Sequence, residues 1–240
     1  MLKVEGLSKR FGGLAAINGL SFEIGQGRAV GLIGPNGAGK TTLFNLITGF
    51  LTPDEGDVFF NGRSLLGLKP HVICRRGISR TFQLVKPFLQ LSVLENVMIG
   101  AFRDTRDPAQ AEKIAREIIA LFDFRDKIHQ PAASLALPER KLLEIARTLA
   151  TRPKLLLLDE SMAGLTPTEV DQMIVFLRRL KQDSGVTLLI IEHVMRAIMS
   201  ISDRIIVIHH GEKIAEGSPQ TVVKDPNVIT AYLGHGYLAS

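Results

Sequence analysis

The sequence contains a single cysteine and no tryptophan, and it lacks long apolar runs. The one cysteine, Cys74, cannot form a disulfide within the chain, so we expect it to be structural and the protein to suit a reducing compartment. No apolar run approaches the ~18 residues that a membrane-spanning helix requires. An alternating pattern begins at Met1, and we expect no signal peptide. These absences argue against a disulfide-stabilised scaffold and against an integral membrane protein.

The composition is that of a chain with a large core and a modest positive charge. Hydrophobic residues make up 45% of the 240 residues, which is enough to fold a large α/β domain without disulfides. The formal net charge is +5, but the basic residues are scattered along the chain. A solvated basic face explains this distribution better than a nucleic-acid footprint, which would be clustered, and we expect no nucleic-acid partner.

A glycine-rich stretch near the N-terminus provides the strongest motif. An apolar run at 29–33 precedes it and apolar residues recur at helical spacing after it, so a strand, a turn and a helix follow one another. The stretch fits the pattern G-x-x-x-x-G-K-[ST] of a phosphate-binding loop. Its residues are Gly34, Pro35, Asn36, Gly37, Ala38, Gly39, Lys40 and Thr41, and Thr42 follows them.

This order of elements would create an anion site. Glycines let backbone N–H groups turn toward a phosphate, and the helix N-terminus adds partial positive charge. We expect Lys40 to reach the β- and γ-phosphates, Thr41 to offer its hydroxyl to Mg²⁺, and Thr42 to belong to the same nucleotide-binding segment. The alternative is a chance match in a glycine-rich turn. In this context the motif predicts a nucleoside triphosphate site.

The remaining pattern predicts an α/β fold with a largely parallel sheet. Antiparallel strands are expected over residues 1–28, and a strand at 57–60 leads into the hairpin signal Asn61-Gly62. Strands and helices alternate after residue 150, which is typical of parallel strands. Residues 86–150 show helical patterns without strand signals, and we interpret this block as a helical insertion. The expected helices are 91–102, 109–124, one that begins at Pro138, 168–183 and 194–200; the expected later strands are 155–158, 186–191, 204–208 and 213–215.

The apolar strand at 155–158 is followed by two carboxylates, Asp159 and Glu160. In phosphate-loop NTPases such a strand lies beside the loop, and its terminal aspartate holds Mg²⁺. Glu160 would then be placed to polarise a water that attacks the γ-phosphate. In isolation, the two residues would indicate only a solvated acidic turn. Together with Lys40, they predict hydrolysis of the nucleotide.

The order of residues 34–41, Gln83, 155–160 and His193 resembles the ATP-binding subunit of an ABC transporter over nearly the whole chain. The resemblance implies one ABC ATPase domain over 1–240, with a P-loop NTPase (RecA-like) core, an antiparallel β subdomain and an inserted helical subdomain at about 86–150. The implied cofactors are ATP and Mg²⁺.

The same resemblance assigns roles to three further residues. It implies that Gln83 senses the γ-phosphate or Mg²⁺ and that His193 contacts the γ-phosphate, whereas alone His193 would be an ordinary loop histidine. It also implies that Phe11 stacks on adenine, since a phenyl ring can stack on a base without a hydrogen bond. The alternative for Phe11 is a plain core phenylalanine.

Two positions depart from the family pattern. The signature Leu-Ser-Gly-Gly-Gln is replaced by Leu135-Ala136-Leu137-Pro138-Glu139, which lacks the serine hydroxyl and both glycines. Pro138 has no N–H to donate, although a helix N-terminus would still attract phosphate. The second departure is Thr166, where the family often has aspartate. Because the signature of one subunit completes the site of the other, the resemblance implies a second ATP-binding subunit that is not identical to this chain.

Several short phrases resemble the branched-chain amino acid importer type, among them Arg80-Thr81-Phe82-Gln83, Met162-Ala163-Gly164-Leu165 and residues 228–234. This resemblance implies a peripheral subunit at the cytoplasmic face of the inner (plasma) membrane that powers import through integral membrane permease subunits. The region around 83–94 would dock a cytoplasmic helix of a permease, and a solute-binding protein would act indirectly. The alternatives are a urea or amide importer, a lipopolysaccharide-export ATPase, a non-transport ABC-type ATPase and a nucleotide-binding regulator without turnover.

Overall fold

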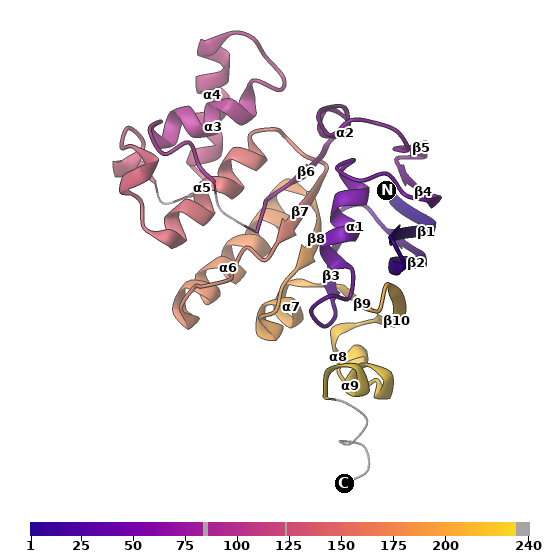
Figure 1. The fold of residues 1–240 in the computed structure, drawn as a ribbon. Coiled ribbons are helices and arrows are strands. Elements are labelled where there is room, and N and C mark those ends of the chain that lie inside the picture. Colours follow the sequence, from indigo (N-terminus) through magenta and orange to yellow (C-terminus); the bar gives the residue numbers. More distant parts are fainter. Residues whose placement is uncertain (84–85, 123, 234–240) are drawn as a thin grey trace.

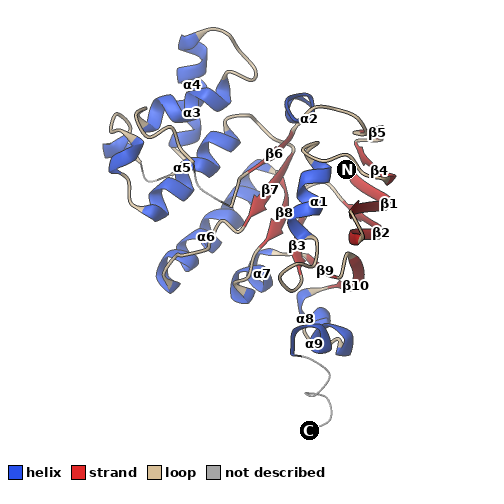
Figure 2. Cartoon of the chain, viewed as in Figure 1, coloured by secondary structure: helices blue, strands red, loops and turns tan. Residues whose placement is uncertain are grey.

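The strands form two sheets within residues 1–83, 86–122 and 124–233, which the computed structural model describes (Figure 1, Figure 2). One sheet is antiparallel and has the order β2-β1-β4-β5. Its turns lie at Gly12-Gly13 and at Asn61-Gly62, and the second of these is where the sequence predicts a hairpin. The bounds of its strands are β1 (Leu2–Phe11), β2 (Leu14–Ile24), β4 (Glu55–Phe60) and β5 (Arg63–Ser64).

The second sheet has the order β10-β9-β3-β8-β7-β6 and is parallel except for the pair β9 and β10. The parallel sheet is the one expected from strands that alternate with helices. Strand β3 lies between β8 and β9, so the loop that follows it leaves from the middle of the sheet edge. The bounds of the strands are β3 (Ala29–Ile33), β6 (Ile78–Arg80), β7 (Leu155–Asp159), β8 (Thr187–Ile191), β9 (Arg204–His209) and β10 (Glu212–Gly217).

Successive side chains of a strand point to opposite faces of the sheet. In the central strands of this sheet, the side chains on both faces are buried. In β7, Leu155 and Leu157 pack with α1 (Lys40–Ile47) and with the antiparallel sheet. Leu156 and Leu158 pack on the other face, in the core that includes α6 (Pro167–Ser184) and α7 (Met195–Ile201). Helix α1 therefore lies between the two sheets, as Figure 1 shows.

Helices α3, α4 and α5 gather to one side of the parallel sheet, away from the antiparallel sheet (Figure 1). A capping box begins α3: the Ser92 hydroxyl accepts a hydrogen bond from the Glu95 N–H, and the Glu95 carboxylate accepts one from the Ser92 N–H. In the described ranges, no helix is long and apolar enough to span a membrane. The bounds are α2 (Pro70–Arg76), α3 (Val93–Ala101), α4 (Pro108–Ile119), α5 (Leu137–Leu149), α8 (Pro219–Val222) and α9 (Pro226–Leu233), with 3₁₀ turns at Arg125–Lys127 and Ala132–Ser134.

The predicted helix over 109–124 is wrong at its C-terminal end, because α4 stops at Ile119. The rings of Phe122 and Phe124 stack with centroids 5.8 Å apart, and Phe122 meets Phe176 of α6 at 4.6 Å. The packing of these rings on α6 outweighs the helical spacing of apolar residues that predicts a longer helix. Residue 123 lies outside the described residues. Pro138 lies at the second position of α5 rather than the first. The sequence predicts neither β6 nor α2. In the case of β6, a strand of three residues shows no periodicity.

Candidate functional site

The phosphate-binding motif forms a tight loop between β3 and α1. Gly39 has a φ of 103°, and a Cβ at that position would lie 2.3 Å from a backbone carbonyl oxygen of β2. A Cβ on Gly34 would lie 2.1 Å from a backbone carbonyl oxygen of β9. The loop is thus packed between two strands at positions where only glycine fits. Its outer surface is accessible, because Asn36, Gly37 and Thr41 are exposed and Pro35, Gly39 and Thr42 are partly exposed.

Lys40 is the first residue of α1, and only 6% of its surface is exposed. Its ammonium donates hydrogen bonds to the carbonyl oxygens of Gly34 and Pro35, at 2.7 and 3.0 Å. Burial lowers the pKa of Lys40, while the charges of Glu160 and Asp159 oppose that shift. The ammonium therefore lies within the loop and acts electrostatically on both carboxylates that the sequence predicts as its partners.

Asp159 lies at the end of β7 and is almost fully buried. Its Oδ2 atom accepts a hydrogen bond from Arg80 at 2.5 Å, and the same guanidinium donates to the Asn45 Oδ1 of α1 at 2.6 Å. Burial raises the pKa of Asp159, and the bond and charge of Arg80 oppose this. The other carboxylate oxygen, Oδ1, is buried and accepts no hydrogen bond from the part of the chain that the structure describes.

The structure brings Gln83, Glu160 and His193 together from three different segments. The Gln83 amide donates a hydrogen bond to the Glu160 Oε2 at 2.6 Å, and the His193 Nε2 lies 3.1 Å from the Glu160 Oε1. Glu160 follows β7, His193 follows β8, and these strands are neighbours in the sheet. Each oxygen of one carboxylate thus has its own partner, which fixes the orientation of that carboxylate at the sheet edge where Lys40 lies.

Phe11 ends strand β1, and 49% of its surface is exposed. It pairs with Leu14 across the β1–β2 hairpin, and the Lys9 ammonium lies 5.9 Å from its ring centroid. A plain core phenylalanine is therefore excluded. The hairpin continues into the part of β2 that packs on Gly39, so this exposed ring belongs to an element that contacts the phosphate-binding loop.

The atypical signature occupies the N-terminus of α5, where Ala136 at the N-cap position provides no side-chain hydrogen bond to the first turn. The Glu139 carboxylate accepts a hydrogen bond from the Ala136 N–H at 3.0 Å. Arg140 covers the carbonyl oxygen of Leu135 at 2.8 Å. Leu137, at the position of a family glycine, is 49% exposed. This helix N-terminus presents the apolar side chain of Leu137 and the Glu139 carboxylate where the resemblance implies a serine hydroxyl and glycines.

Thr166, the second departure, caps helix α6. Its hydroxyl accepts a hydrogen bond from the Glu169 N–H at 3.4 Å, and the Glu169 carboxylate accepts one from the Thr166 N–H at 2.7 Å. Threonine and aspartate both cap helices through a side-chain oxygen. Threonine in place of aspartate therefore still caps the start of the helix, but it carries no negative charge.

Several residues near the site were not predicted from the sequence. Arg80 anchors Asp159, and the nearly fully buried Lys141, Glu144 and Glu192 lie behind Glu160. Charged residues at these spacings look like solvated positions in a sequence, so only the structure shows their burial. Tyr232 of α9 was not predicted either: its side chain lines a hollow together with Ile33, the residue before the loop, and partial burial raises the pKa of its hydroxyl. The resemblance at 228–234 was the one signal there, and residue 234 lies outside the described residues.

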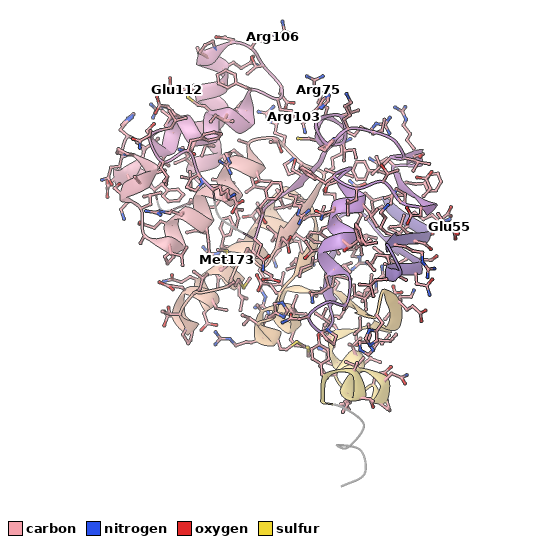
Figure 3. All side chains as sticks on the ribbon, viewed as in Figure 1. Glu55, Arg75, Arg103, Arg106, Glu112 and Met173 are labelled. Carbon is pink, nitrogen blue, oxygen red and sulfur yellow. The ribbon has the colours of Figure 1, made fainter. Side chains whose placement is uncertain are left out.

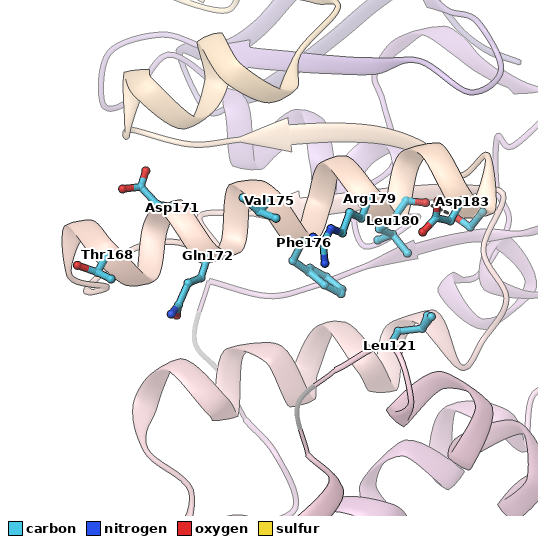
Figure 4. Close-up of a pocket in the computed structure, with 10 residues that line it drawn as sticks. Leu121, Thr168, Asp171, Gln172, Val175, Phe176, Arg179, Leu180 and Asp183 are labelled. Carbon is cyan, nitrogen blue, oxygen red and sulfur yellow. Dashed lines mark hydrogen bonds between the residues drawn. The ribbon is translucent and has the colours of Figure 1, made fainter.

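A separate groove of about 690 Å³ lies between helix α6 and the segment that carries Leu121 (Figure 4). Val175, Phe176 and Leu180 form its apolar wall, and none of the predicted site residues lines it. It therefore plays no part in the nucleotide chemistry.

The profile of the family described as "ABC transporter" matches residues 17–163. The chain belongs to the ABC transporter ATPase family. It is the ATP-binding subunit of a transport complex. The family match confirms the prediction that the nucleotide is ATP. A second profile, described as "Branched-chain amino acid ATP-binding cassette transporter", matches residues 212–237.

Individual ABC ATPases match the chain along nearly its full length. The high-affinity branched-chain amino acid transport ATP-binding protein BraF of Pseudomonas aeruginosa is 40% identical over 249 aligned positions, which cover 98% of each chain. The protein LivG of Escherichia coli, described in the same words, is 38% identical with the same coverage. A crystal structure of an ABC transporter ATP-binding cassette in its ADP conformation has a TM-score of 0.88, 33% identity and 98% coverage of both chains. The predicted fold class and the resemblance to this type of ATPase are confirmed.

Proposed function

We propose that this ABC ATPase uses ATP and Mg²⁺ to drive the import of branched-chain or related amino acids through separate membrane subunits. The group formed by Gln83, Glu160 and His193 beside Lys40 is the observation that carries the hydrolytic part. The choice of solute rests on the relatives described as branched-chain amino acid transport proteins, which match 98% of this chain. One ABC ATPase domain over 1–240, with helical residues 86–150 as its inserted part, is the organisation that this function requires.

Glu160 would act as the general base. Gln83 and His193 hold its two oxygens at 2.6 and 3.1 Å, so the carboxylate is oriented before a reaction begins. A water beside it would lose a proton as it attacks the γ-phosphate. Lys40 would neutralise charge that develops on the phosphate oxygens, and Gln83 and His193 would contact the γ-phosphate. Phe11 would stack on the adenine, because its ring is exposed on a hairpin that touches the loop.

The residues at the loop fit a magnesium ion. The Asp159 Oδ1 is a buried carboxylate oxygen without a hydrogen-bond partner in the described ranges, and Thr41 exposes its side chain at the start of α1. Asp159, Thr41 and Gln83 would hold the ion through oxygen atoms, since Mg²⁺ usually takes few protein ligands together with phosphate oxygens. When bound, the ion would neutralise charge on the β- and γ-phosphates.

A groove next to the site is shaped for a helix from a membrane subunit. It measures about 370 Å³ and lies between the core and helices α3 and α5. Phe50, Phe82 and Ile99 give it exposed apolar surface, and the rings of Phe50 and Phe82 meet edge to face at 5.9 Å. Because Gln83 directly follows Phe82, a helix seated here would be linked to the Glu160 carboxylate. The predicted docking region also includes residues 84–85, which lie outside the described residues.

Two arginines lie beside Cys74, a residue that lines the groove. Arg103 donates a hydrogen bond to the Cys74 carbonyl oxygen at 3.3 Å, and Arg75 follows Cys74 on α2. Figure 3 shows Arg75, Arg103 and Arg106 on this part of the surface. Arg103 pairs with Asp104 at 2.7 Å, and we therefore expect the docking helix of the membrane subunit to carry an acidic side chain that faces Arg75 or Arg106.

The partner that closes the nucleotide site would be a different ATP-binding subunit. The 135–139 segment offers the partner no serine hydroxyl and no glycine, so a pair of identical chains would have two poor signatures. A solute-binding protein would deliver the amino acid to the permease subunits, and this chain would sit at the cytoplasmic face of the membrane, bound to them.

Substitution of Glu160 by glutamine tests the assigned base. In the assembled complex with permease subunits and partner ATPase, Glu160→Gln should bind ATP and remain closed around it, with hydrolysis reduced by about 100-fold or more. Lys40→Ala serves as the comparison, because it should lose ATP binding itself. Hydrolysis at the wild-type rate by Glu160→Gln would show that the base is assigned wrongly.

The alternative functions differ in their partners and in turnover. Co-purification with polytopic membrane proteins would separate the importer from a non-transport ABC-type ATPase. ATP turnover by the assembled complex would separate it from a regulator that only binds nucleotide. Stimulation of that turnover by a solute-binding protein loaded with leucine, rather than urea or an amide, would favour branched-chain amino acid import over the related importers and over lipopolysaccharide export.

A further inference from the structure

Lys141 of helix α5 is a buried lysine that reaches the candidate base. Only 5% of its surface is exposed. Its ammonium donates a hydrogen bond to the backbone carbonyl oxygen of Glu160 at 3.4 Å. Lys141 therefore links the helical region, which also carries the atypical signature, to the peptide that bears the catalytic carboxylate.

Carboxylates surround this ammonium from several elements. Glu192, Glu144 and Glu160 all act on it electrostatically. Glu192 accepts hydrogen bonds from the Met162 N–H at 2.7 Å and the Ser161 hydroxyl at 3.2 Å, in the segment after β7. Glu144 accepts one from the Phe82 N–H at 3.0 Å, next to Gln83. The segments that carry Glu160, Glu192 and Gln83 thus meet around one cation.

The backbone of Glu160 needs such support. Its φ is +50°, a left-handed conformation that is unfavourable for residues with a Cβ and persists when the surroundings fix it. Its N–H donates to the Ile191 carbonyl oxygen at 2.9 Å, which holds one side of the residue. Lys141 holds the other side through the carbonyl oxygen.

We propose that Lys141 is a positioning residue for ATP hydrolysis: by holding the Glu160 peptide, it aims the carboxylate at Gln83 and His193. This rests on the proposed role of Glu160 as the base. Lys141 is almost fully buried, and it acts on the reaction through the Glu160 peptide. Since hydrolysis depends on where the base points and ATP binding does not, loss of Lys141 lowers kcat and leaves the KM for ATP unchanged.

The experiment measures ATPase kinetics of the assembled complex that carries Lys141→Met. We expect kcat to fall by roughly 10-fold to 100-fold, the scale of a misplaced catalytic group, with KM for ATP changed less than about two-fold. Lys141→Arg, which keeps a cationic donor, should retain most of the activity. Lys181→Met is the matched control, because it also removes a lysine that donates hydrogen bonds, here to the Asp203 oxygens at 2.6 and 2.7 Å, away from the site. Its kcat should be unchanged.

The double variant separates positioning from stability. In the Glu160→Gln background, Lys141→Met should cause no further loss of the residual rate, whereas a merely structural effect would add to it. If Lys141→Met does not fold, Lys141→Gln is subject to the same expectations; failure of both to fold would assign Lys141 to stability and overturn the proposal. Unchanged kcat in Lys141→Met with an inactive Glu160→Gln would also overturn it and leave the proposed function intact. A fully active Glu160→Gln would instead refute the proposed function.

Discussion

Glu192 illustrates how burial alters a single residue near the site. Only 3% of its surface is exposed, and burial raises its pKa above the usual 4.5, with the charge of Glu160 adding to the shift. Hydrogen bonds from Met162 and Ser161 and the charge of Lys141 oppose it. The folded state therefore binds the proton more tightly than the unfolded chain. This contribution to stability is fully present below pH 4.5 and is lost as the pH rises through the native pKa.

Substitution of Glu192 by glutamine should remove that pH dependence. Glutamine can still accept the Met162 N–H, but it does not ionise. The Tm of Glu192→Gln relative to wild type should therefore rise as the pH is raised from about 4.5 to about 8, because only the wild type loses stability over that range. Thermal unfolding followed by circular dichroism in matched buffers measures the difference. A difference that is constant or that falls with pH would contradict this account.

The phosphate-binding residues could be predicted from the sequence, whereas the charges behind them could not. Lys40 and Thr41 lie in a motif whose spacing fixes its local geometry, and Gln83 and His193 were found through resemblance. Arg80 and Lys141 give no such signal, because a lone cation on a helix or short strand usually indicates a solvent-facing position. Their roles depend on which segments the fold brings next to them, and a single sequence does not contain that information.

Among the elements, helix α6 depends on its N-cap, the residue that precedes it. Thr166 and Glu169 form a capping box that satisfies N–H groups at the helix start. Thr166→Ala should lower the free energy of unfolding by about 1 kcal/mol, as measured by urea denaturation. Thr166→Asp should leave stability near that of the wild type, because aspartate caps equally well. An equal loss in both variants would mean that the cap is not the source of stability here.

The C-terminal helix α9 is an element that connects to the phosphate-binding loop. Its Tyr232 lines a hollow together with Ile33, the residue before Gly34. Tyr232→Phe removes only the hydroxyl beside this segment, and we expect ATP binding that is roughly 2- to 10-fold weaker, the equivalent of one polar contact of about 0.5–1.5 kcal/mol. Thr230→Val is the control, since it removes a hydroxyl that bonds to Pro226 within the same helix. If calorimetry gives equal ATP affinities for both variants, then α9 does not contribute to nucleotide binding.

Elements with strong patterns were predicted, and elements defined by their neighbours were not. The apolar strands β7 and β8 and the long helix α6 are evident from composition and periodicity alone. Strand β6 has three residues and exists because it pairs with β7, and α4 ends early because Phe122 packs on α6. In both cases tertiary contacts decide the outcome.

At the scale of the assembly, the atypical signature predicts two unequal ATP sites. The site with Lys40 and Glu160 would be completed by the partner's signature, and the partner's loop would face the segment 135–139 of this chain. In the reconstituted pair, Glu160→Gln should remove most ATP turnover, while the corresponding glutamate-to-glutamine change in the partner should remove much less. ATPase rates of the two complexes measure this. Equal losses would contradict the inequality of the sites.

The strand order has a consequence for how the chain folds during synthesis. Strand β3 ends at Ile33, but its two sheet neighbours begin only at Thr187 and Arg204, roughly 150 residues or more later. At about 5–20 residues per second, the apolar β3 waits on the order of 8 to 30 s for its first neighbour to leave the ribosome. Since Gly34 packs on β9, the loop cannot take its final form until β9, the second neighbour, has also been synthesised. Nucleotide can therefore stabilise the finished chain but cannot guide its early folding, and chaperones have that interval in which to protect the exposed strand.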